Sequence, residues 1–290
     1  MNATNRPFPA HQTISPVEKG RWIGLSRGEF VTALFVLTIA NALLPNMLHG
    51  LFTKSPLYTV VSLFEISVIV WAAIFIAAQL TLEEPLGEIS FFEKIVSVPI
   101  VAASLLPIGP ISWVLVTLMA LYLIVTQSGQ SAMRRAGWIF LALAFPMFWS
   151  KRLFNILAEY FLSLDAILVS SITHTQRISN LVEMPGGDGF LEIAPRCSSM
   201  ANVSLAVLCW VLFTQTRRTE WRPANIVWCS AACLLVIVIN VTRISLIGFF
   251  PSYYDLLHGD VGSTITNWLT VIAVFAVCNY GARRAPLNSL

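Results

Sequence analysis

Residues 225–249 read NIVWCSAACLLVIVINVTRISLIGF, an apolar run in which Arg243 is the one charged side chain. A helix needs about 20 mostly apolar residues to cross the hydrocarbon core of a membrane, so this run predicts a spanning helix. The whole chain shares its character, because 56% of its 290 residues are hydrophobic and only 11% are charged. A soluble domain carries about 25% charged residues. The sequence therefore predicts an all-α integral membrane protein.

Seven further apolar runs predict spanning helices, which makes eight in all. The run at residues 94–106 is the weakest, because it is short and contains Pro99. The predicted spans cover residues 30–44, 57–80, 94–106, 111–126, 136–149, 198–214, 225–249 and 262–280.

Short clusters of Lys and Arg between these runs predict the orientation, since basic loops stay in the cytoplasm. An even number of spans puts every cluster inside, with a polar cytoplasmic tail at residues 1–27 and a single membrane domain at residues 28–290. Segments near residues 45–56, 107–110, 150–197 and 250–261 then lie outside. The net charge of +3 is small and sits in these clusters, so no nucleic-acid partner is expected.

Two features are expected in the long outer segment before the sixth span. Apolar residues recur at helical spacing over residues 151–171, which predicts an amphipathic helix lying in the outer interface. The alternative is a ninth span, in which Glu159 and Asp165 would need buried partners. Two short apolar stretches around the Gly-rich turn at residues 185–189 then predict a β-hairpin or a tight loop over residues 177–196.

Cys197 differs from the other four cysteines, which lie inside apolar runs where a cysteine is usually a small hydrophobic residue. No CxxC motif is present, so the sequence signals neither a zinc site nor a dithiol redox site. Cys197 lies at the outer boundary where the sixth span begins. A helix amino terminus and the nearby cations Arg196 and Arg243 favour a nucleophilic thiolate there. The alternative is that Cys197 only precedes a helix capped by Ser198.

Arg243 and His258 fall at the same predicted depth as Cys197, on the next two helices. A permanent charge within an apolar run is costly unless it is paired or faces water, which makes Arg243 a functional candidate. Asn240 lies three residues earlier and is expected to orient the guanidinium. His258 is the candidate acid or base. The alternatives are an arginine that snorkels to the surface, a solvated loop histidine, and His174 in the place of His258.

Three motifs carry a resemblance to a known family. They read APRCSS at residues 194–199, NVTRI at residues 240–244 and HGDVG at residues 258–262, which ends on Gly262. In this order and at this spacing the sequence resembles the exosortase and archaeosortase family of membrane-embedded cysteine transpeptidases. Ser199 stands where the family usually has glycine, and the aromatic residue expected soon after Gly262 arrives only at Trp268. These departures suggest a divergent subgroup.

The resemblance implies a function at the outer face of the inner (plasma) membrane. Cys197 would attack a peptide carbonyl in an exported protein with a carboxy-terminal sorting tail, Arg243 would stabilise the oxyanion, and His258 would protonate the leaving amine. Asn240, Ser198 and Gly262 would support this site. A lipid or surface acceptor would then receive the protein, and no cofactor or metal is expected. Nothing in the sequence predicts an oligomeric state.

The alternative hypothesis is a non-enzymatic function, namely a transporter or scaffold of an exopolysaccharide or surface-display system. It predicts paired charges at the membrane midplane and inverted repeats, and neither is clear in the sequence. A membrane phosphatase would need a further basic motif and a Ser-Gly-His step, and both are absent. Glu65, in the middle of the second predicted span, has no assigned role.

Overall fold

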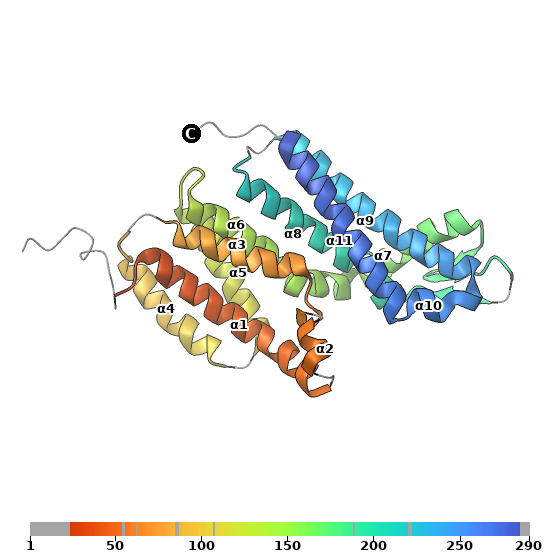
Figure 1. Ribbon diagram of the computed structural model, residues 1–290, viewed down its shortest axis with the longest axis horizontal. Coiled ribbons are helices and arrows are strands. Elements are labelled where there is room, and N and C mark those ends of the chain that lie inside the picture. The colour runs from red at the N-terminus through yellow and green to blue at the C-terminus, as the bar shows by residue number, and fades with distance from the viewer. Residues whose placement is uncertain are drawn as a thin grey trace, which may run out of the picture.

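The computed structural model describes residues 24–53, 56–61, 63–84, 87–106, 108–187, 189–219 and 222–284. Residues 1–23 of the predicted cytoplasmic tail lie outside the described residues. Figure 1 shows an elongated helical protein with a small sheet. In chain order its elements are α1 (Arg27–Thr53), α2 (Pro56–Val61), η1 (Leu63–Glu65), α3 (Val68–Leu82), α4 (Phe91–Ser104), α5 (Gly109–Thr126), α6 (Ala132–Ala144), η2 (Phe145–Trp149), α7 (Ser150–Thr173), β1 (Arg177–Ile178), β2 (Leu181–Glu183), β3 (Phe190–Glu192), η3 (Pro195–Cys197), α8 (Met200–Thr216), α9 (Pro223–Phe249), η4 (Pro251–Tyr253), α10 (Tyr254–His258) and α11 (Asp260–Arg284).

Five helices in the described residues are long and apolar enough to cross a membrane, and α3 and α8 are shorter apolar helices. This agrees with the predicted all-α membrane protein. Every predicted span contains at least one helix in the structure. The five long helices are Arg27–Thr53, Gly109–Thr126, Ala132–Thr173, Pro223–Phe249 and Val261–Arg284.

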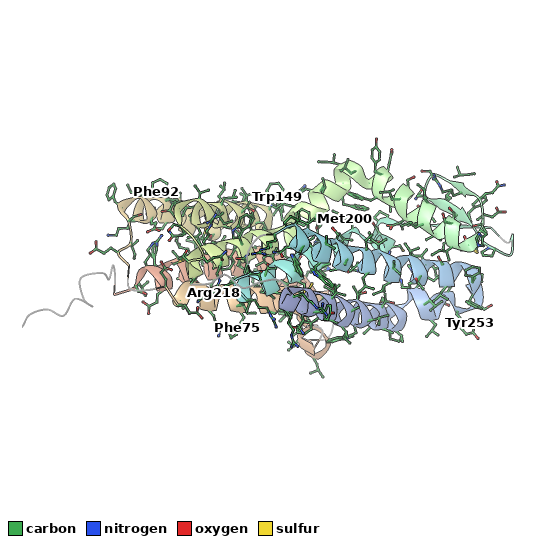
Figure 2. All side chains as sticks on the ribbon, turned by 90° about the horizontal axis from the view of Figure 1, so that it is seen from above. Phe75, Phe92, Trp149, Met200, Arg218 and Tyr253 are labelled. Carbon is green, nitrogen blue, oxygen red and sulfur yellow. The ribbon has the colours of Figure 1, made fainter. Side chains whose placement is uncertain are left out.

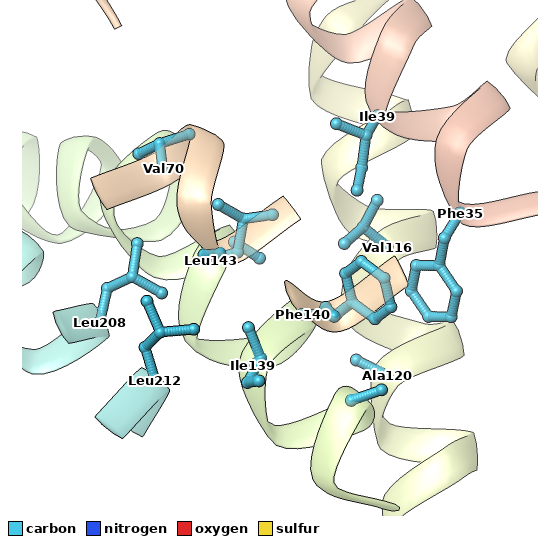
Figure 3. Close-up of a cluster of buried hydrophobic side chains, with 14 of the residues drawn as sticks. Phe35, Ile39, Val70, Val116, Ala120, Ile139, Phe140, Leu143, Leu208 and Leu212 are labelled. Carbon is cyan, nitrogen blue, oxygen red and sulfur yellow. The ribbon is translucent and has the colours of Figure 1, made fainter. Parts of the chain in front are cut away.

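The main core forms around α6, which packs against α3, α5 and α8. Leu143 and Ile139 of α6 are fully buried, and the ring of Phe140 stacks on Phe35 of α1 with a centroid distance of 3.8 Å (Figure 3). Alanine and glycine positions on α5 and α6 let the two backbones approach closely, as is common between membrane helices. Helices α1, α3, α4, α5, α6 and α8 therefore form one packed bundle.

The second predicted span is not one helix, so the position expected for Glu65 is wrong. The chain forms α2, turns through η1 and starts again as α3. Leu63, Phe64 and Glu65 all have positive φ, a conformation that non-glycine residues rarely adopt. Ser67 then caps α3, because its Oγ accepts a hydrogen bond from the Ile69 amide. Glu65 thus lies in a strained turn between two helices instead of mid-helix.

The predicted amphipathic helix exists as α7, but it continues directly from α6. Five residues of π-helix join the two, and they include Pro146, which has no amide hydrogen to donate. The continuous helix of 42 residues is roughly 63 Å long, about twice the hydrocarbon thickness. It carries a kink at Leu157. Because the chain does not turn back before α7, the helix gives no support to a separate ninth crossing.

The side of α7 that packs on the protein differs from the predicted apolar stripe. Leu162, Asp165, Ala166 and Val169 are buried, while Glu159 is exposed. Most of the predicted stripe faces away from the bundle: Ile156, Tyr160, Leu164, Ile167 and Leu168 are exposed. This outward apolar stripe suits a helix that contacts lipid.

The predicted hairpin is present within a three-stranded antiparallel sheet of order β1-β2-β3. Strands β2 and β3 pair Val182 with Leu191, and the Gly-rich segment turns the chain between them. Gly187 and Gly189 have positive φ, which explains the glycines of this turn. The buried side chain of Val182 packs the sheet onto α7 and α9.

Helix α9 is the central helix of the second half of the molecule, because it packs against α7, α8 and α11. In Figure 2, Tyr253, just beyond α9, lies at the end of the long axis opposite Phe92. Arginines gather at the other end of the bundle, where Arg217 donates to Asn279 and Arg27 pairs with Glu93 at 2.8 Å. We call this the basic end.

One close approach between α9 and α11 makes a prediction. A Cβ atom at Gly281 would lie 2.6 Å from Cγ of Trp228. Because this Cγ atom is close to the α9 backbone, the Trp228 side chain cannot move away. Gly281→Ala should therefore cost about 1–3 kcal/mol through overpacking and lower the thermal melting temperature in detergent. Gly248→Ala is the matched control, since its Cβ makes ordinary contacts at 3.8 Å. Equal melting temperatures for the two variants would contradict this packing.

Candidate functional site

Cys197 ends the short 3-10 turn η3, three residues before α8 begins. The turn follows β3, and it is fixed at its start because Ile193 exchanges two hydrogen bonds with Asn180, at 2.9 and 3.2 Å. The Cys197 amide donates to the Ala194 carbonyl at 2.8 Å, which closes the turn. Cys197 is only 9% exposed. The sheet thus delivers the cysteine to a defined place at the start of α8.

A small hydrophobic cluster surrounds Cys197, separate from the main core around α6. It draws on α7, the sheet and α9, so the cysteine lies where these elements meet the start of α8. Its other buried members are Leu162, Ala166, Val169, Val182, Ile193, Val241 and Ile244.

Asn240 holds the backbone of Cys197 directly. Its Nδ2 donates to the Cys197 carbonyl at 2.6 Å and to Ser199 Oγ at 3.1 Å. Both amide hydrogens are therefore used, and the side chain is 5% exposed. Sequence reasoning expected Asn240 to orient Arg243. In the structure it fixes the cysteine turn instead.

The chain of hydrogen bonds continues from Ser199 to Asp165 of α7. Ser199 Oγ donates to Asp165 Oδ1 at 2.9 Å, and the Ser199 amide donates to Asp165 Oδ2 at 3.1 Å. Each donor and acceptor fits, because Asn240 donates to the hydroxyl and the hydroxyl donates to the carboxylate. Asp165 is 5% exposed. We call Asn240, Ser199 and Asp165 the cysteine clamp.

Asp165 is a residue of the candidate site that the sequence analysis did not select. It was considered only as an acid that would need a buried partner in a ninth span. A signal was present, because Asp165 lies on the helical face of Leu162, Ala166 and Val169. A lone acid on an otherwise apolar face indicates a buried polar partner. Its partner, Ser199, is the residue that replaces the expected glycine. The serine hydroxyl therefore bridges α7 and α9, which a glycine would not do.

Ser198 is buried beside the cysteine, with its Oγ accepting from the Met200 amide at 3.4 Å. Ser199, which occupies the cap position of α8, uses its side chain on Asp165 and makes no capping bond. The start of α8 therefore depends on the cysteine clamp more than on an ordinary serine cap.

Arg243 lies one turn beyond Asn240 on α9, next to Val241 and Ile244 of the cysteine cluster. Its Nε is buried and has no hydrogen-bond partner among the residues that the structure describes. No described carboxylate pairs with it. A half-buried guanidinium with an unused donor is equipped to bind an anionic or carbonyl oxygen of a ligand. The side chain of Arg196, the other expected cation, lies outside the described residues.

His258 ends α10, is exposed, and stacks on the ring of Tyr254 with a centroid distance of 5.0 Å. Within the described part of the chain, no hydrogen bond joins it to Cys197 or Arg243. Gly262 has a clear structural purpose, since a Cβ there would lie 2.4 Å from the Leu256 carbonyl oxygen. The glycine therefore lets α11 start tightly against α10. His174 is exposed at the left-handed end of α7.

Across the described residues, no group of three or more His, Cys, Asp or Glu side chains could hold a metal ion. Comparisons of the chain with protein-family models, with curated proteins and with solved structures found no match. The site must therefore be judged on its own residues and contacts.

The cysteine clamp predicts that replacing Asp165 lowers the stability of the protein. Asp165→Ala leaves two buried donors of Ser199 without an acceptor, at a cost of about 1–3 kcal/mol each, so the melting temperature in detergent should fall by several degrees. Asp165→Asn keeps one acceptor and should fall between wild type and alanine. Glu159→Ala, at an exposed acid of the same helix, is the control and should change nothing. The same order should appear in the rate at which Cys197 reacts with a thiol reagent, since the turn becomes looser.

Proposed function

We propose that this protein is a membrane-embedded cysteine peptidase and transpeptidase. It cleaves the carboxy-terminal sorting tails of exported proteins at the outer face of the membrane and transfers the proteins to a lipid or surface acceptor. The observation that carries the proposal is the fixed position of Cys197. Asn240 donates one hydrogen bond to the Cys197 carbonyl and one to Ser199 Oγ, at the junction of α7, α8 and α9. The exosortase-like order of the three motifs agrees with this role.

The proposed topology has eight spans, with both termini in the cytoplasm and the site outside. It is supported by the five long apolar helices, by the shorter apolar helices α3 and α8, and by α4. The gathering of Arg27, Arg217 and Arg284 at or beside the basic end agrees with the positive-inside rule. Helix α7 then lies against the outer leaflet, which its outward apolar stripe supports.

The proposed chemistry assigns one step to each of three side chains. The Cys197 thiolate bonds to the scissile carbonyl carbon, and α8 starts three residues later, so its dipole favours negative charge there. Arg243 stabilises the tetrahedral oxyanion in a site of low dielectric. The carbon–nitrogen bond then breaks, and His258 gives a proton to the departing amine. The remaining thioester is resolved when an acceptor nucleophile bonds to the carbonyl carbon and releases the thiol.

His258 requires a movement in this mechanism, because it is exposed on the short helix α10 and not bonded to Cys197. Hydrogen bonds of catalytic groups are often formed only in the complex with substrate. In the proposed mechanism, binding of the tail brings His258 towards Cys197.

The transporter alternative predicts charges paired at mid-membrane. The described cluster of Arg27, Glu84 and Glu93 instead lies at the basic end.

The activity is tested by expressing the protein with a tail-bearing exported protein from the same genome and following loss of the tail. Cys197→Ala should abolish processing, and Arg243→Ala and His258→Ala should lower it at least about 100-fold, the usual range for a lost oxyanion donor or general acid. Cys229→Ala and His174→Ala are matched controls and should process normally. If all three site variants process the tail at normal protein levels, the proposal is wrong.

The topology is tested with reporter domains fused after residues 130, 218 and 284 and within the α4–α5 connection. A reporter that is active only in the cytoplasm should work in the first three fusions and fail in the last. Activity in the α4–α5 fusion would contradict eight spans with the site outside.

A further inference from the structure

A cleft of about 700 Å³ lies over α8, between α3 and α11. Both helices pack on α8, and Figure 1 shows α8 between them. The cleft is lined by the turn before α3, by the first two turns of α8 and by the first half of α11. Nothing in the mechanism above uses it.

The cleft changes from polar to apolar along two of its walls. On α11 the lining passes from Thr264 and Asn267 to Val274, and on α8 from Asn202 to Leu205. The third wall, from the turn before α3, mixes polar and apolar residues. On α8 and α11 the polar residues lie nearer the end of α8 where Cys197 is found. The gradient on these two helices indicates an amphiphilic ligand whose polar part points towards Cys197.

The polar groups of the cleft suit a peptide better than a phospholipid. The described lining residues include no lysine or arginine. A phosphate headgroup favours such cations. Asn202 and Asn267, by contrast, both donate and accept, which is what the backbone of a non-helical peptide needs inside a membrane.

The size of the cleft limits the length of peptide that it holds. Pockets of about 300–1,000 Å³ hold ligands of drug size, so the cleft suits a segment of a few residues. This is far short of the roughly 20 residues of a whole spanning helix. Asn202 lies five residues after Cys197, so at most about 17 Å of chain separate them. A peptide in the cleft reaches Cys197 with about five extended residues.

We propose that the cleft binds the junction of the substrate's sorting tail, where the extended recognition motif becomes the transmembrane helix. This inference rests on the proposed function and adds a substrate subsite to it. The polar outer half of the cleft pairs with the backbone amides and carbonyls that the helix has not yet satisfied. The apolar inner half receives the first turn of the tail helix. The motif then extends across the start of α8 to Cys197.

The subsite is tested with two substitutions in the cleft, using a purified tail-bearing protein from the same genome in detergent. Thr264→Trp blocks the mouth of the cleft and should raise KM more than tenfold, with kcat unchanged. Asn267→Leu removes one hydrogen-bonding group and should raise KM about two- to tenfold. Ile272→Trp is the control, because Ile272 is exposed on α11 and does not line the cleft. Labelling of Cys197 by a small thiol reagent should be the same in all variants.

The outcomes separate this inference from the proposed function. If Cys197→Ala abolishes processing while both cleft variants keep the wild-type KM, the subsite is wrong and the function stands. If Cys197→Ala processes normally, the function itself is wrong. A photocrosslinker at residue 267, combined with Cys197→Ala, should capture the tail protein. Capture of a phospholipid that excess tail protein does not displace would overturn the peptide assignment.

Discussion

The buried hydrogen bonds that run from Asn240 through Ser199 to Asp165 determine how this protein presents Cys197. They join α9, the start of α8 and α7 with distances of 2.6 to 3.1 Å. Each side chain is nearly free of solvent, so a missing partner would leave a buried polar group unpaired. The network is therefore costly to break, and it fixes a turn that has little regular secondary structure of its own. Without it, the loop after β3 would have several ways to enter α8.

The same network connects the candidate site to the surface of α7. One face of α7 holds Asp165 and packs on the cysteine cluster, while the opposite face exposes Ile156, Tyr160 and Leu164. On the proposed topology, α7 contacts lipid on one side and the cysteine turn on the other, and so sets the height of Cys197 relative to the membrane. This position would suit the proposed cleavage beside the point where a substrate leaves the membrane. The cleft over α8 lies on the far side of the same turn, towards α3 and α11.

Hydropathy predicted most of the fold, since each apolar run contains a helix. The physical reason is that a backbone in lipid must satisfy its own hydrogen bonds, which a helix does. Hydropathy did not predict the break at residues 63–65. Three consecutive residues there have positive φ, and hydropathy carries no information about backbone conformation. It also missed the continuity of α6 and α7, because the charges of Lys151 and Arg152 end the apolar run but do not end the helix. Cys197 and Arg243 were selected as candidate site residues from their unusual positions in the sequence. Asp165 was not, because pairing with Ser199 depends on contacts between residues 34 positions apart.

Attack of Cys197 on the substrate is tested by isolating the acyl-enzyme. The purified protein is mixed with a tail-bearing substrate, quenched in acid within the first turnover and analysed by peptide mass spectrometry. We expect the amino-terminal part of the substrate to be attached to Cys197 through a thioester, which hydroxylamine releases. We also expect slow acceptors to increase the amount of this species. Processing of the tail without an adduct at Cys197, or with an adduct at another residue, would contradict attack by Cys197.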